Sequence, residues 1–466
     1  MEYNTIIPSK IPCNDLPATS KVKKLYSFVF FLYSQCMEKN RVKGCYDRYP
    51  AAKEQWQQPA IWKVVNRAIE KITTLYGFSE VVTPSFEYTE VFTRSSGEES
   101  DIVSKEMYTF ADKKGRLLSL RPELTAPTIR AYIENGGMNE KLSKLFYNGS
   151  CYRYDRQQKG RYRQFHQFGV EVIGLKDPFI DIEVISMLVH FFEMLGITKT
   201  TLLINSIGSK NCRKLYEKEL VAYFCKHMDH LSEDSKRRLS TNPLRILDSK
   251  DPADIKIKEG CPNILDFIGA AEKEHFATVL EGLDRLGINY TVDKNLVRGL
   301  DYYTDTVFEL VRADFTSGQN SLGGGGRYDG LVKALGGKDL PGVGFGLGLE
   351  RTIQYLLDEN VTFPEETPPQ YYFIPLNAEC KMILASFVNS CRKASIIAEI
   401  DPEYSVKNGL KNANDKKAQY AIILGPDEFK QGVCKVKNLS QRTESTYPIK
   451  NLHTFLIDGS NQPTLT

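Results

Sequence analysis

Residues 145–174 are LFYNGSCYRYDRQQKGRYRQFHQFGVEVIG, where polar side chains alternate with apolar and aromatic ones at the two-residue period of a β-strand. Two such runs flank the polar centre DRQQKGRYR, so the stretch predicts a hairpin. Successive side chains of a strand point to opposite faces. One face of the hairpin would therefore carry Cys151, Arg153 and Asp155 on the first arm and Phe165, Gln167, Gly169 and Glu171 on the second.

The predicted tip of this hairpin is basic. Arg156, Lys159, Arg161 and Arg163 lie close together in the sequence around Gly160. Such a cluster suits a polyanion, for example a triphosphate or the phosphates of RNA. A solvated hairpin tip would show the same pattern, and the local sequence does not choose between these two interpretations.

The composition is that of a globular protein with room for two or three domains. Its 466 residues are 41% hydrophobic and 26% charged. Because 61 Lys and Arg nearly balance 58 Asp and Glu, any contact with nucleic acid would come from local patches. Ten cysteines without a C-x-x-C pair argue against a zinc ribbon and a disulfide framework, and favour a reduced, cytoplasmic location.

Residues 1–42 are predicted to be a leader that is weakly ordered or is not part of the natural protein. The apolar run LYSFVFFLY, residues 25–33, follows several lysines as in a signal peptide, but no small-residue cleavage pattern comes after it. The run is too short to span a bilayer, so we expect no membrane association. Met37 could serve as an alternative start.

An amphipathic helix is predicted over residues 55–76. Apolar side chains recur there at intervals of three and four, and Gly77 ends the pattern. A β-rich segment around Pro84 follows. Any surface helix followed by a strand would look similar, so this pair carries little functional information by itself.

Residues 117–128, LLSLRPELTAPT, combine a carboxylate and a hydroxyl. Pro122 disfavours helical geometry at Arg121, so we expect an extended segment with Glu123 and Thr125 on one side. These two acceptors together suit an ammonium group. The alternative is a helix that begins here with Thr125 as its cap.

Two helical regions follow the hairpin. Residues 180–195 predict a core helix, and residues 208–287 show helical spacing with few strand signals, which favours a helical insertion. His227 and His230 in this insertion could bind a metal in principle. Without further partners they are interpreted as a solvated helix face, and no metal ligand is assigned.

Residues 297–308, VRGLDYYTDTVF, bring one guanidinium and two phenols close together. Arg298, Tyr302 and Tyr303 could converge on one small polar ligand. A surface loop followed by tandem tyrosines at a sheet edge would show the same residues.

Two glycine-rich runs come next, LGGGGRYDGL over residues 322–331 and PGVGFGLGLERTIQYLL from Pro341. The first is not a phosphate-binding loop, because no G-K-[ST] follows it. Alternating glycines from Gly342 to Gly348 predict a flat strand on which an adenine ring could lie. A helix bearing Glu350 and Arg351 would follow.

The end of the chain predicts a separate domain. Residues 362–370, TFPEETPPQ, have the composition of a linker. Beyond them strand and helix patterns alternate as β, α, β, α, β, which predicts a small α/β domain with a mixed sheet over residues 371–466. Lysines between residues 407 and 417 could face phosphates or solvent equally well.

Five of these segments, in order, resemble the histidyl-tRNA synthetases, a family of class II aminoacyl-tRNA synthetases. The helix and strand around Pro84 resemble the first class II motif, the hairpin the second, and the run ending at Arg351 the third. RPELTAP resembles the family's RPE-x-T segment, and RGLDYYT resembles a signature that other class II enzymes lack. The resemblance covers about residues 43–456.

The resemblance implies an α+β fold. Residues 43–207 and 288–361 would form the catalytic domain, a six-stranded antiparallel sheet flanked by helices, interrupted by the helical insertion at 208–287. Residues 371–466 would be the anticodon-binding domain. Because the first motif builds the dimer interface in the family, a homodimer is also implied.

The resemblance further implies a reaction. L-histidine and ATP would form histidyl-adenylate and pyrophosphate, with Mg²⁺ bridging the phosphates, and the histidyl group would pass to tRNA(His). Glu123, Thr125 and Gln167 would hold the α-amino group, and Glu171 and Tyr303 the imidazole. The implied histidine-binding residues are Glu123, Thr125, Arg153, Gln167, Glu171, Arg298, Tyr302 and Tyr303.

The implied catalytic residues are Arg153 and Arg298, which would neutralise two anions as they meet. Phe165 and Arg351 would sandwich the adenine, and Arg161 would reach the distal phosphates. The implied ATP-binding residues are Arg153, Asp155, Arg161, Phe165 and Arg351. Asp155 and Gln157 depart from the Glu and Pro that are common at these positions in the family.

Two non-catalytic relatives are alternatives, a regulatory subunit of histidine biosynthesis and a tRNA-binding sensor module. The first typically lacks the anticodon-binding domain and parts of RGLDYY, whereas this sequence contains both. The second should have lost active-site arginines, yet Arg153, Arg298 and Arg351 are present.

Overall fold

The computed structural model describes residues 41–97, 100, 102–155, 160–313, 320–361, 363 and 367–458. The chain divides into two compact units, Met1–Phe363 and Pro364–Thr466, and each is considered by itself. The predicted leader up to residue 40 lies outside the described residues. So do Arg156, Gln157 and Lys159 at the hairpin tip.

The first unit is built on an eight-stranded sheet with the order β1-β5-β6-β11-β10-β9-β7-β8. The strands are β1 (Ser79–Glu80), β5 (Ser143–Tyr152), β6 (Gln164–Ile173), β7 (Thr200–Ser206), β8 (Tyr290–Val292), β9 (Thr304–Arg312), β10 (Ser321–Arg327) and β11 (Gly342–Gly348). In this spatial order, every pair of neighbouring strands from β5 to β7 is antiparallel. The predicted α+β class is confirmed.

The expectation of six strands describes only the antiparallel middle of this sheet. Two short strands, β1 and β8, add to its edges in parallel pairings with β5 and β7. They have two and three residues, too few to show an alternating pattern in the sequence. The sheet therefore has eight strands.

The predicted hairpin is confirmed as β5 and β6. Cys151 pairs with Phe165 and Tyr147 with Gly169 in the antiparallel register. Arg153 and Asp155 come directly after the end of β5 and are not in a strand. They nevertheless line the same cavity as Phe165.

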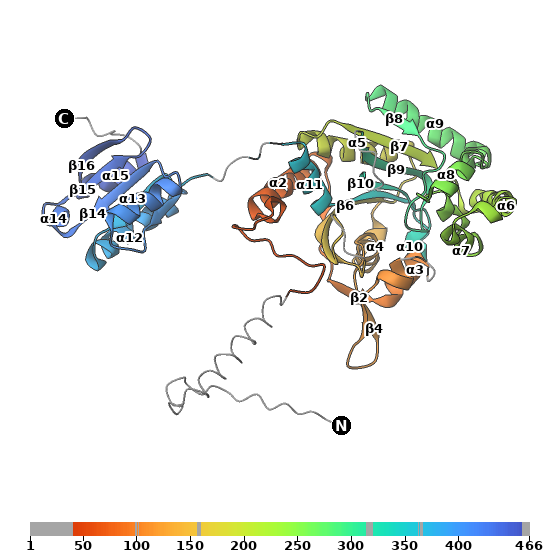
Figure 1. Ribbon diagram of the computed structural model, residues 1–466, viewed down its shortest axis with the longest axis horizontal. Helices are drawn as coiled ribbons and strands as arrows, with labels where there is room; N and C mark the ends of the chain where they lie inside the picture. Colours follow the sequence, from red (N-terminus) through yellow and green to blue (C-terminus); the bar gives the residue numbers. More distant parts are fainter. Residues whose placement is uncertain are drawn as a thin grey trace. The chain divides into compact units, whose positions relative to one another are not determined.

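The helices that cover the apolar face of the sheet include α2 (Pro59–Tyr76), α5 (Pro178–Met194) and α11 (Leu349–Asp358) (Figure 1). A 3-10 turn at Gln55–Gln57 precedes α2, which begins at Pro59 because proline fits the first helical position. Gly77 ends α2 with a φ of 72°, a left-handed conformation that favours glycine. These helices and the strands beneath them share one hydrophobic core.

A small three-stranded sheet, β2-β4-β3, precedes the hairpin, and its β4 end extends away from the central sheet in Figure 1. It consists of β2 (Phe86–Tyr88), β3 (Thr109–Ala111) and β4 (Leu117–Leu120), with α3 (Thr89–Ser96) and α4 (Thr125–Glu134) nearby in the sequence. Its apolar side chains Phe86, Tyr88, Phe110 and Leu117 are exposed.

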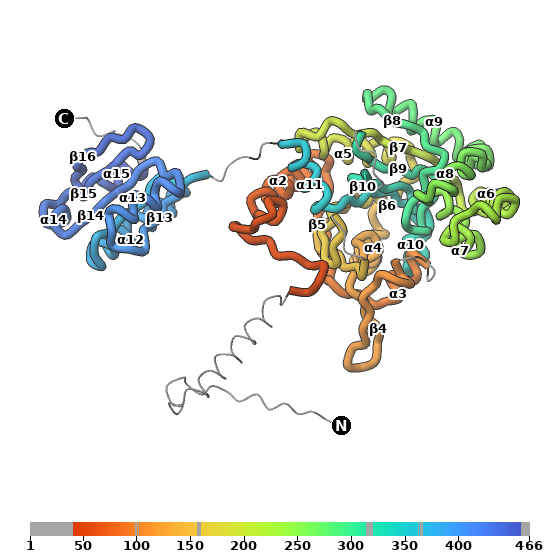
Figure 2. The backbone as a smooth tube through the Cα atoms, viewed as in Figure 1, coloured from red at the N-terminus to blue at the C-terminus, as the bar shows by residue number. Residues whose placement is uncertain are grey.

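Helices fill most of residues 210–285 and lie together at one end of the unit in Figure 2. They are α6 (Lys210–Cys225), α7 (Glu233–Thr241), α8 (Pro252–Lys258) and α9 (Ala270–Arg285). Tyr216 and Leu220 of α6 belong to the same hydrophobic cluster as Tyr302 and Tyr303. The helical region thus packs against the segment that precedes β9.

The second unit contains the predicted mixed sheet, in the order β13-β12-β14-β15-β16. Its strands are β12 (Tyr371–Pro375), β13 (Ala398–Ile400), β14 (Tyr420–Leu424), β15 (Val433–Asn438) and β16 (Thr443–Pro448), and its helices α12 (Ala378–Lys393), α13 (Val406–Asp415), α14 (Pro426–Lys430) and α15 (Ile449–Asp458). The first three strands are parallel, and β15 and β16 add an antiparallel pair that the sequence pattern did not reveal.

No helix in the described part of the chain is both long enough and apolar enough to cross a membrane.

Candidate active site

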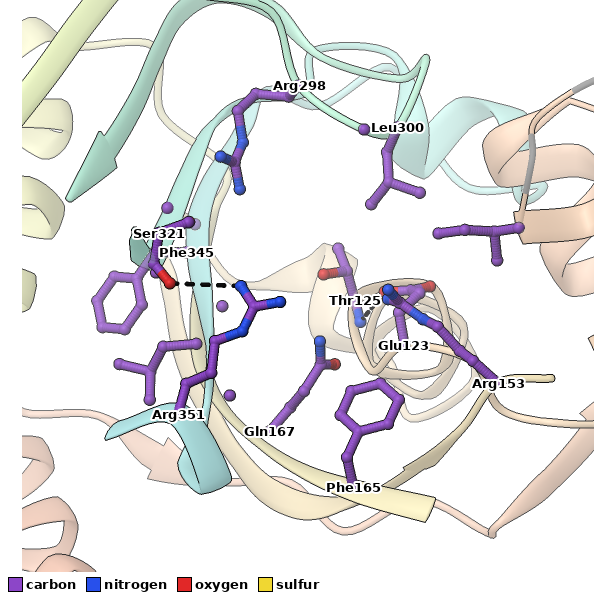
Figure 3. Close-up of a pocket in the computed structure, with 18 of the residues that line it drawn as sticks. Glu123, Thr125, Arg153, Phe165, Gln167, Arg298, Leu300, Ser321, Phe345 and Arg351 are labelled. Carbon is purple, nitrogen blue, oxygen red and sulfur yellow. Dashed lines mark hydrogen bonds between the residues drawn. The ribbon is translucent and has the colours of Figure 1, made fainter. Parts of the chain in front are cut away.

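All the predicted site residues line one cavity of about 420 Å³ in the first unit, shown in Figure 3. They are Glu123, Thr125, Arg153, Asp155, Arg161, Phe165, Gln167, Glu171, Arg298, Tyr302, Tyr303 and Arg351. The strands β6, β10 and β11 contribute its floor, and the start of α4 contributes part of its wall.

Glu123 and Thr125 lie at a helix N-terminus, so the expectation of an extended segment is wrong. Helix α4 begins at Thr125, and the Glu123 carboxylate accepts the backbone N–H groups of Thr125 at 2.5 Å and Ala126 at 2.9 Å. Glu123 therefore caps the N-terminus of α4, the role for which Thr125 was the candidate. Burial raises the pKa of Glu123, although these N–H groups oppose the rise.

Glu171 is the most deeply buried acid of the cavity, with 1% of its surface exposed. Tyr147 donates its phenol hydrogen to Oε1 at 3.1 Å, and Tyr328 donates to Oε2 at 2.6 Å. Burial raises the pKa of Glu171 to about 8, and the two phenols limit that rise. Neither carboxyl oxygen faces Arg163, whose guanidinium lies over the ring of Tyr154 at 4.2 Å.

Two glycines provide the space that this arrangement needs. A Cβ atom at Gly344 would lie 2.1 Å from Oε2 of Glu171, and one at Gly169 would lie 2.4 Å from the hydroxyl of Tyr147. Any larger residue at Gly344 would also meet the backbone oxygen of Val170. The glycines therefore admit the carboxyl and the phenol to the same side of the sheet.

Arg298 reaches the cavity from the segment before β9. Its Nη1 lies 3.1 Å from Oε1 of Glu309, and a Cβ at Gly324 would come within 3.0 Å of the guanidinium. Burial disfavours the charged guanidinium, but Glu309 and Tyr303 outweigh this effect and the pKa of Arg298 is raised. Its Nε is buried and has no hydrogen-bond partner among the described residues.

Tyr302 and Tyr303 are both buried beside Glu171. Their ring centroids are 4.8 Å apart, and Tyr302 also contacts the ring of Tyr328 at 6.0 Å. Burial raises the pKa of both phenols, so both remain protonated and can donate a hydrogen.

The opposite end of the cavity is lined by arginines and an aromatic ring. The Arg153 guanidinium lies 5.1 Å from the centre of the Phe165 ring, and Arg351 donates from Nη1 to the backbone oxygen of Ser321 at 3.4 Å. Arg161 pairs with Asp155 at 3.2 Å. Burial and the neighbouring charge of Arg161 lower the pKa of Arg351.

Gln167 lies between Arg351 and Phe165 in Figure 3. Its Oε1 accepts from the thiol of Cys151 at 3.2 Å, a contact that follows from the cross-strand register of β5 and β6. With Oε1 engaged, the amide N–H₂ of Gln167 is the group left to face the cavity.

The lining residues that sequence reasoning missed include Tyr147, Tyr328 and Arg245. Tyr147 could have been found, because it shares the alternation of the hairpin and pairs with a glycine. Tyr328 lies in the run LGGGGRYDGL, in which only the glycines were interpreted. Arg245 comes from the helical region, and nothing in its local pattern places it beside the cavity.

The arrangement suits a ligand with two different parts. A small molecule carrying N–H groups and an ammonium can use Glu171, Glu123 and the phenols, while an aromatic ring and phosphates can use Phe165 and the arginines. The cavity therefore has the donors and acceptors for an amino acid and a nucleotide side by side.

Comparisons with known proteins identify the family. A family model described as histidyl-tRNA synthetase matches residues 56–212 and 257–352. A protein named histidine–tRNA ligase from Protochlamydia amoebophila is 44% identical over 402 residues, covering 85% of this chain and 94% of that protein. The chain belongs to the histidyl-tRNA synthetase family.

Other comparisons agree with this membership. A histidine–tRNA ligase of Chlamydia caviae is 43% identical over 407 residues, covering 86% of this chain and 94% of that protein. The crystal structure of the apo S. aureus histidyl-tRNA synthetase matches with a TM-score of 0.74 at 33% identity, over 90% of this chain and 99% of that one. A model described as an anticodon binding domain matches residues 370–458 of this synthetase family member.

The raised pKa of Glu171 predicts a pH-dependent stability difference. The carboxyl titrates near 4.5 when exposed and near 8 when folded, so its contribution to the free energy of unfolding is lost as pH rises through this window. Glu171→Gln cannot titrate. The wild type should therefore lose stability as pH rises while the Glu171→Gln variant does not. In thermal melts, the melting temperature of the variant minus that of the wild type should increase between about pH 6 and about pH 8.5. A constant difference across this range, matching the exposed control Glu193→Gln, would contradict the raised pKa.

Proposed function

We propose that the chain is a histidine–tRNA ligase that activates L-histidine with ATP and transfers the histidyl group to tRNA(His). The observation that carries the proposal is the buried Glu171 carboxyl, which lies between two phenols in a cavity whose other end is lined by arginines. Family membership agrees with this interpretation of the cavity.

Histidine recognition follows from the hydrogen-bonding capacity of the imidazole. We assign one ring N–H to the Glu171 carboxylate and the other ring nitrogen to the phenol of Tyr303, with Tyr302 beside them. An imidazole N–H would favour the ionised form of Glu171 and so oppose the burial that raises its pKa. An apolar amino acid of similar size would leave both polar groups unpaired, which is costly in a buried site.

The α-amino group is assigned to Glu123, Thr125 and Gln167. Glu123 brings a carboxylate held in place by two backbone N–H groups, and Thr125 brings a hydroxyl from the first turn of α4. The charge of an ammonium would be matched by this carboxylate. Histidine would then lie along β6, with Gln167 and Glu171 on the same strand face.

Adenylate formation requires two anions to approach each other. A carboxylate oxygen of histidine attacks the α-phosphorus of ATP, the bond from that phosphorus to the bridging oxygen breaks, and pyrophosphate leaves. We assign Arg298 and Arg153 to the charge that develops there. Figure 3 shows the guanidinium of Arg298 pointing into the open middle of the cavity, and its Nε has no partner among the described residues.

The nucleotide is assigned to the end of the cavity that is lined by arginines and Phe165. Phe165 and Arg351 would enclose the adenine, with Asp155 near the adenine, and Arg161, which pairs with Asp155, would reach the distal phosphates. Mg²⁺ would screen the phosphate charges. In the described residues no three His, Cys, Asp or Glu side chains are grouped to hold a metal ion, which fits a Mg²⁺ bound mainly through the phosphates themselves.

The remaining partners are part of the same proposal. Residues 370–458 match an anticodon-binding domain, so we assign the tRNA anticodon to the second unit. We propose a homodimer, because Phe86 and Tyr88, exposed apolar side chains of β2, belong to the region that resembles the first class II motif. We also propose a cytoplasmic location; the described cysteines are free thiols, which suits a reducing compartment.

The alternative is a non-catalytic relative that regulates histidine biosynthesis or only senses tRNA. A binding module has no need for an arginine held at a reacting phosphate, yet Arg153, Arg298 and Arg351 all line the cavity. The match to an anticodon-binding domain also disfavours the regulatory alternative.

Histidine-dependent exchange of pyrophosphate into ATP tests the proposal. The full-length chain should catalyse this exchange with histidine and with no other amino acid. Arg298→Ala should lower the rate on the order of a hundredfold or more, because it removes one preorganised charge from the transition state. Unchanged thermal melting would show that the variant is folded. A wild-type chain without exchange would contradict the proposed function, and a variant with a normal rate would remove Arg298 from the mechanism.

Glu171→Gln tests the assignment of the imidazole. This change keeps the size of the side chain but removes its charge, so it should weaken histidine recognition by roughly 1.5–3 kcal/mol, about 10- to 150-fold in the KM for histidine. The KM for ATP should change little. Glu193→Gln, on the surface of α5, is the matched control. An unchanged histidine KM in a folded Glu171→Gln protein would show that Glu171 is structural only.

A further inference from the structure

We propose that the helical region between β7 and β8 positions the loop 297–303 for histidine activation, the half of the reaction that uses no tRNA. This inference rests on the proposed function, because that loop carries Arg298, Tyr302 and Tyr303. It assigns the helical region a part in adenylate formation itself. The residues that act are Arg213, Asn242 and Arg245, which are positioning residues and not catalytic ones.

Two side chains of the helical region hold the backbone of the loop through three hydrogen bonds. Arg245 donates from Nη2 to the carbonyl oxygen of Gly299 at 2.5 Å. Arg213 donates from Nη1 to the carbonyl oxygens of Tyr303 at 3.0 Å and Asp301 at 3.4 Å. The carbonyls at 299, 301 and 303, on alternate residues, are therefore all taken by guanidinium groups.

A fourth contact fixes a side chain of the same loop. Asn242 donates from Nδ2 to the carboxylate of Asp301 at 3.0 Å. Asp301 lies directly before the two tyrosines, so this contact holds the point at which the chain enters the cavity wall. Residues 297–303 belong to no helix or strand, which means that such side-chain contacts, together with packing, determine their conformation.

The donors are themselves held in place. Arg238 of α7 donates to the carbonyl oxygen of Arg245 at 3.1 Å, and the backbone N–H of Asn242 donates to the carbonyl of Arg238 at 2.7 Å. Tyr216 and Leu244 of the helical region share a hydrophobic cluster with Tyr302 and Tyr303. The loop therefore packs against a surface whose donor side chains have contacts of their own.

Preorganisation explains why this should affect the rate. A guanidinium lowers a barrier only if it is already placed where charge develops, and small displacements are costly. Arg298 lies next to Gly299, whose carbonyl Arg245 holds, and Arg245 also lines the cavity. The family model matches residues 56–212 and 257–352, so Asn242 and Arg245 lie in a stretch that it does not cover.

An exchange of charge between Asn242 and Asp301 tests the inference in the full-length chain. Asn242→Asp places a second carboxylate against Asp301 and should push the loop away. Histidine-dependent pyrophosphate exchange without tRNA should then fall at least tenfold. Adding Asp301→Asn restores an amide facing a carboxylate, so the double variant should recover to within about threefold of wild type. Arg237→Ala is the control, because Arg237 is an exposed arginine of α7 paired with Asp234.

Each outcome decides the inference. Recovery in the double variant, with unchanged melting temperatures, supports positioning, since a merely destabilising change would not be rescued at the level of rate. If Asn242→Asp does not fold, Arg245→Met replaces it and should show the same loss of exchange. Normal exchange with reduced tRNA charging in these variants would overturn the inference and leave only a tRNA-binding role. Absence of histidine-dependent exchange in the wild type would instead overturn the proposed function.

Discussion

A carboxyl group with 1% exposure must be satisfied by its neighbours, and the centre of this cavity is arranged around that requirement at Glu171. Tyr147 on the adjacent strand and Tyr328 after β10 each give a hydrogen to one carboxyl oxygen. Burial still raises the pKa of Glu171 to about 8. Burying this carboxyl lowers the stability of the fold, and its hydrogen-bonding capacity is fully used only when a ligand donates an N–H to it. The site therefore selects ligands that carry such an N–H.

The position of Glu171 depends in turn on the sheet. Gly344 lies opposite Glu171 in the β6–β11 register and leaves the space that the carboxyl occupies, since a Cβ there would lie 2.1 Å from it. Gly324 makes the corresponding space for Arg298. Both glycines therefore let a charged side chain of the cavity lie directly against the sheet.

Local periodicity and spacing were sufficient for the hairpin, the helix before Gly77 and the strand of alternating glycines, because each pattern spans many residues. Periodicity and spacing did not predict the features that tertiary contacts determine. Strands of two and three residues have no pattern to detect, and Glu123 became a helix cap because its carboxylate reaches two free N–H groups. Tyr328 and Arg245 reach the cavity through pairings between segments far apart in the sequence, which no local pattern records. The residue roles came from the family resemblance and stay predictions.

The central claim is that a buried carboxyl selects histidine at one end of a cavity that binds ATP at the other. A crystal structure of the protein with L-histidine and a non-hydrolysable ATP analogue measures this directly. The account predicts an imidazole nitrogen within hydrogen-bonding distance of the Glu171 carboxylate, the amino group at Glu123 and Gln167, and the adenine between Phe165 and Arg351. An imidazole bound away from Glu171, with that carboxylate still held only by Tyr147 and Tyr328, would contradict it.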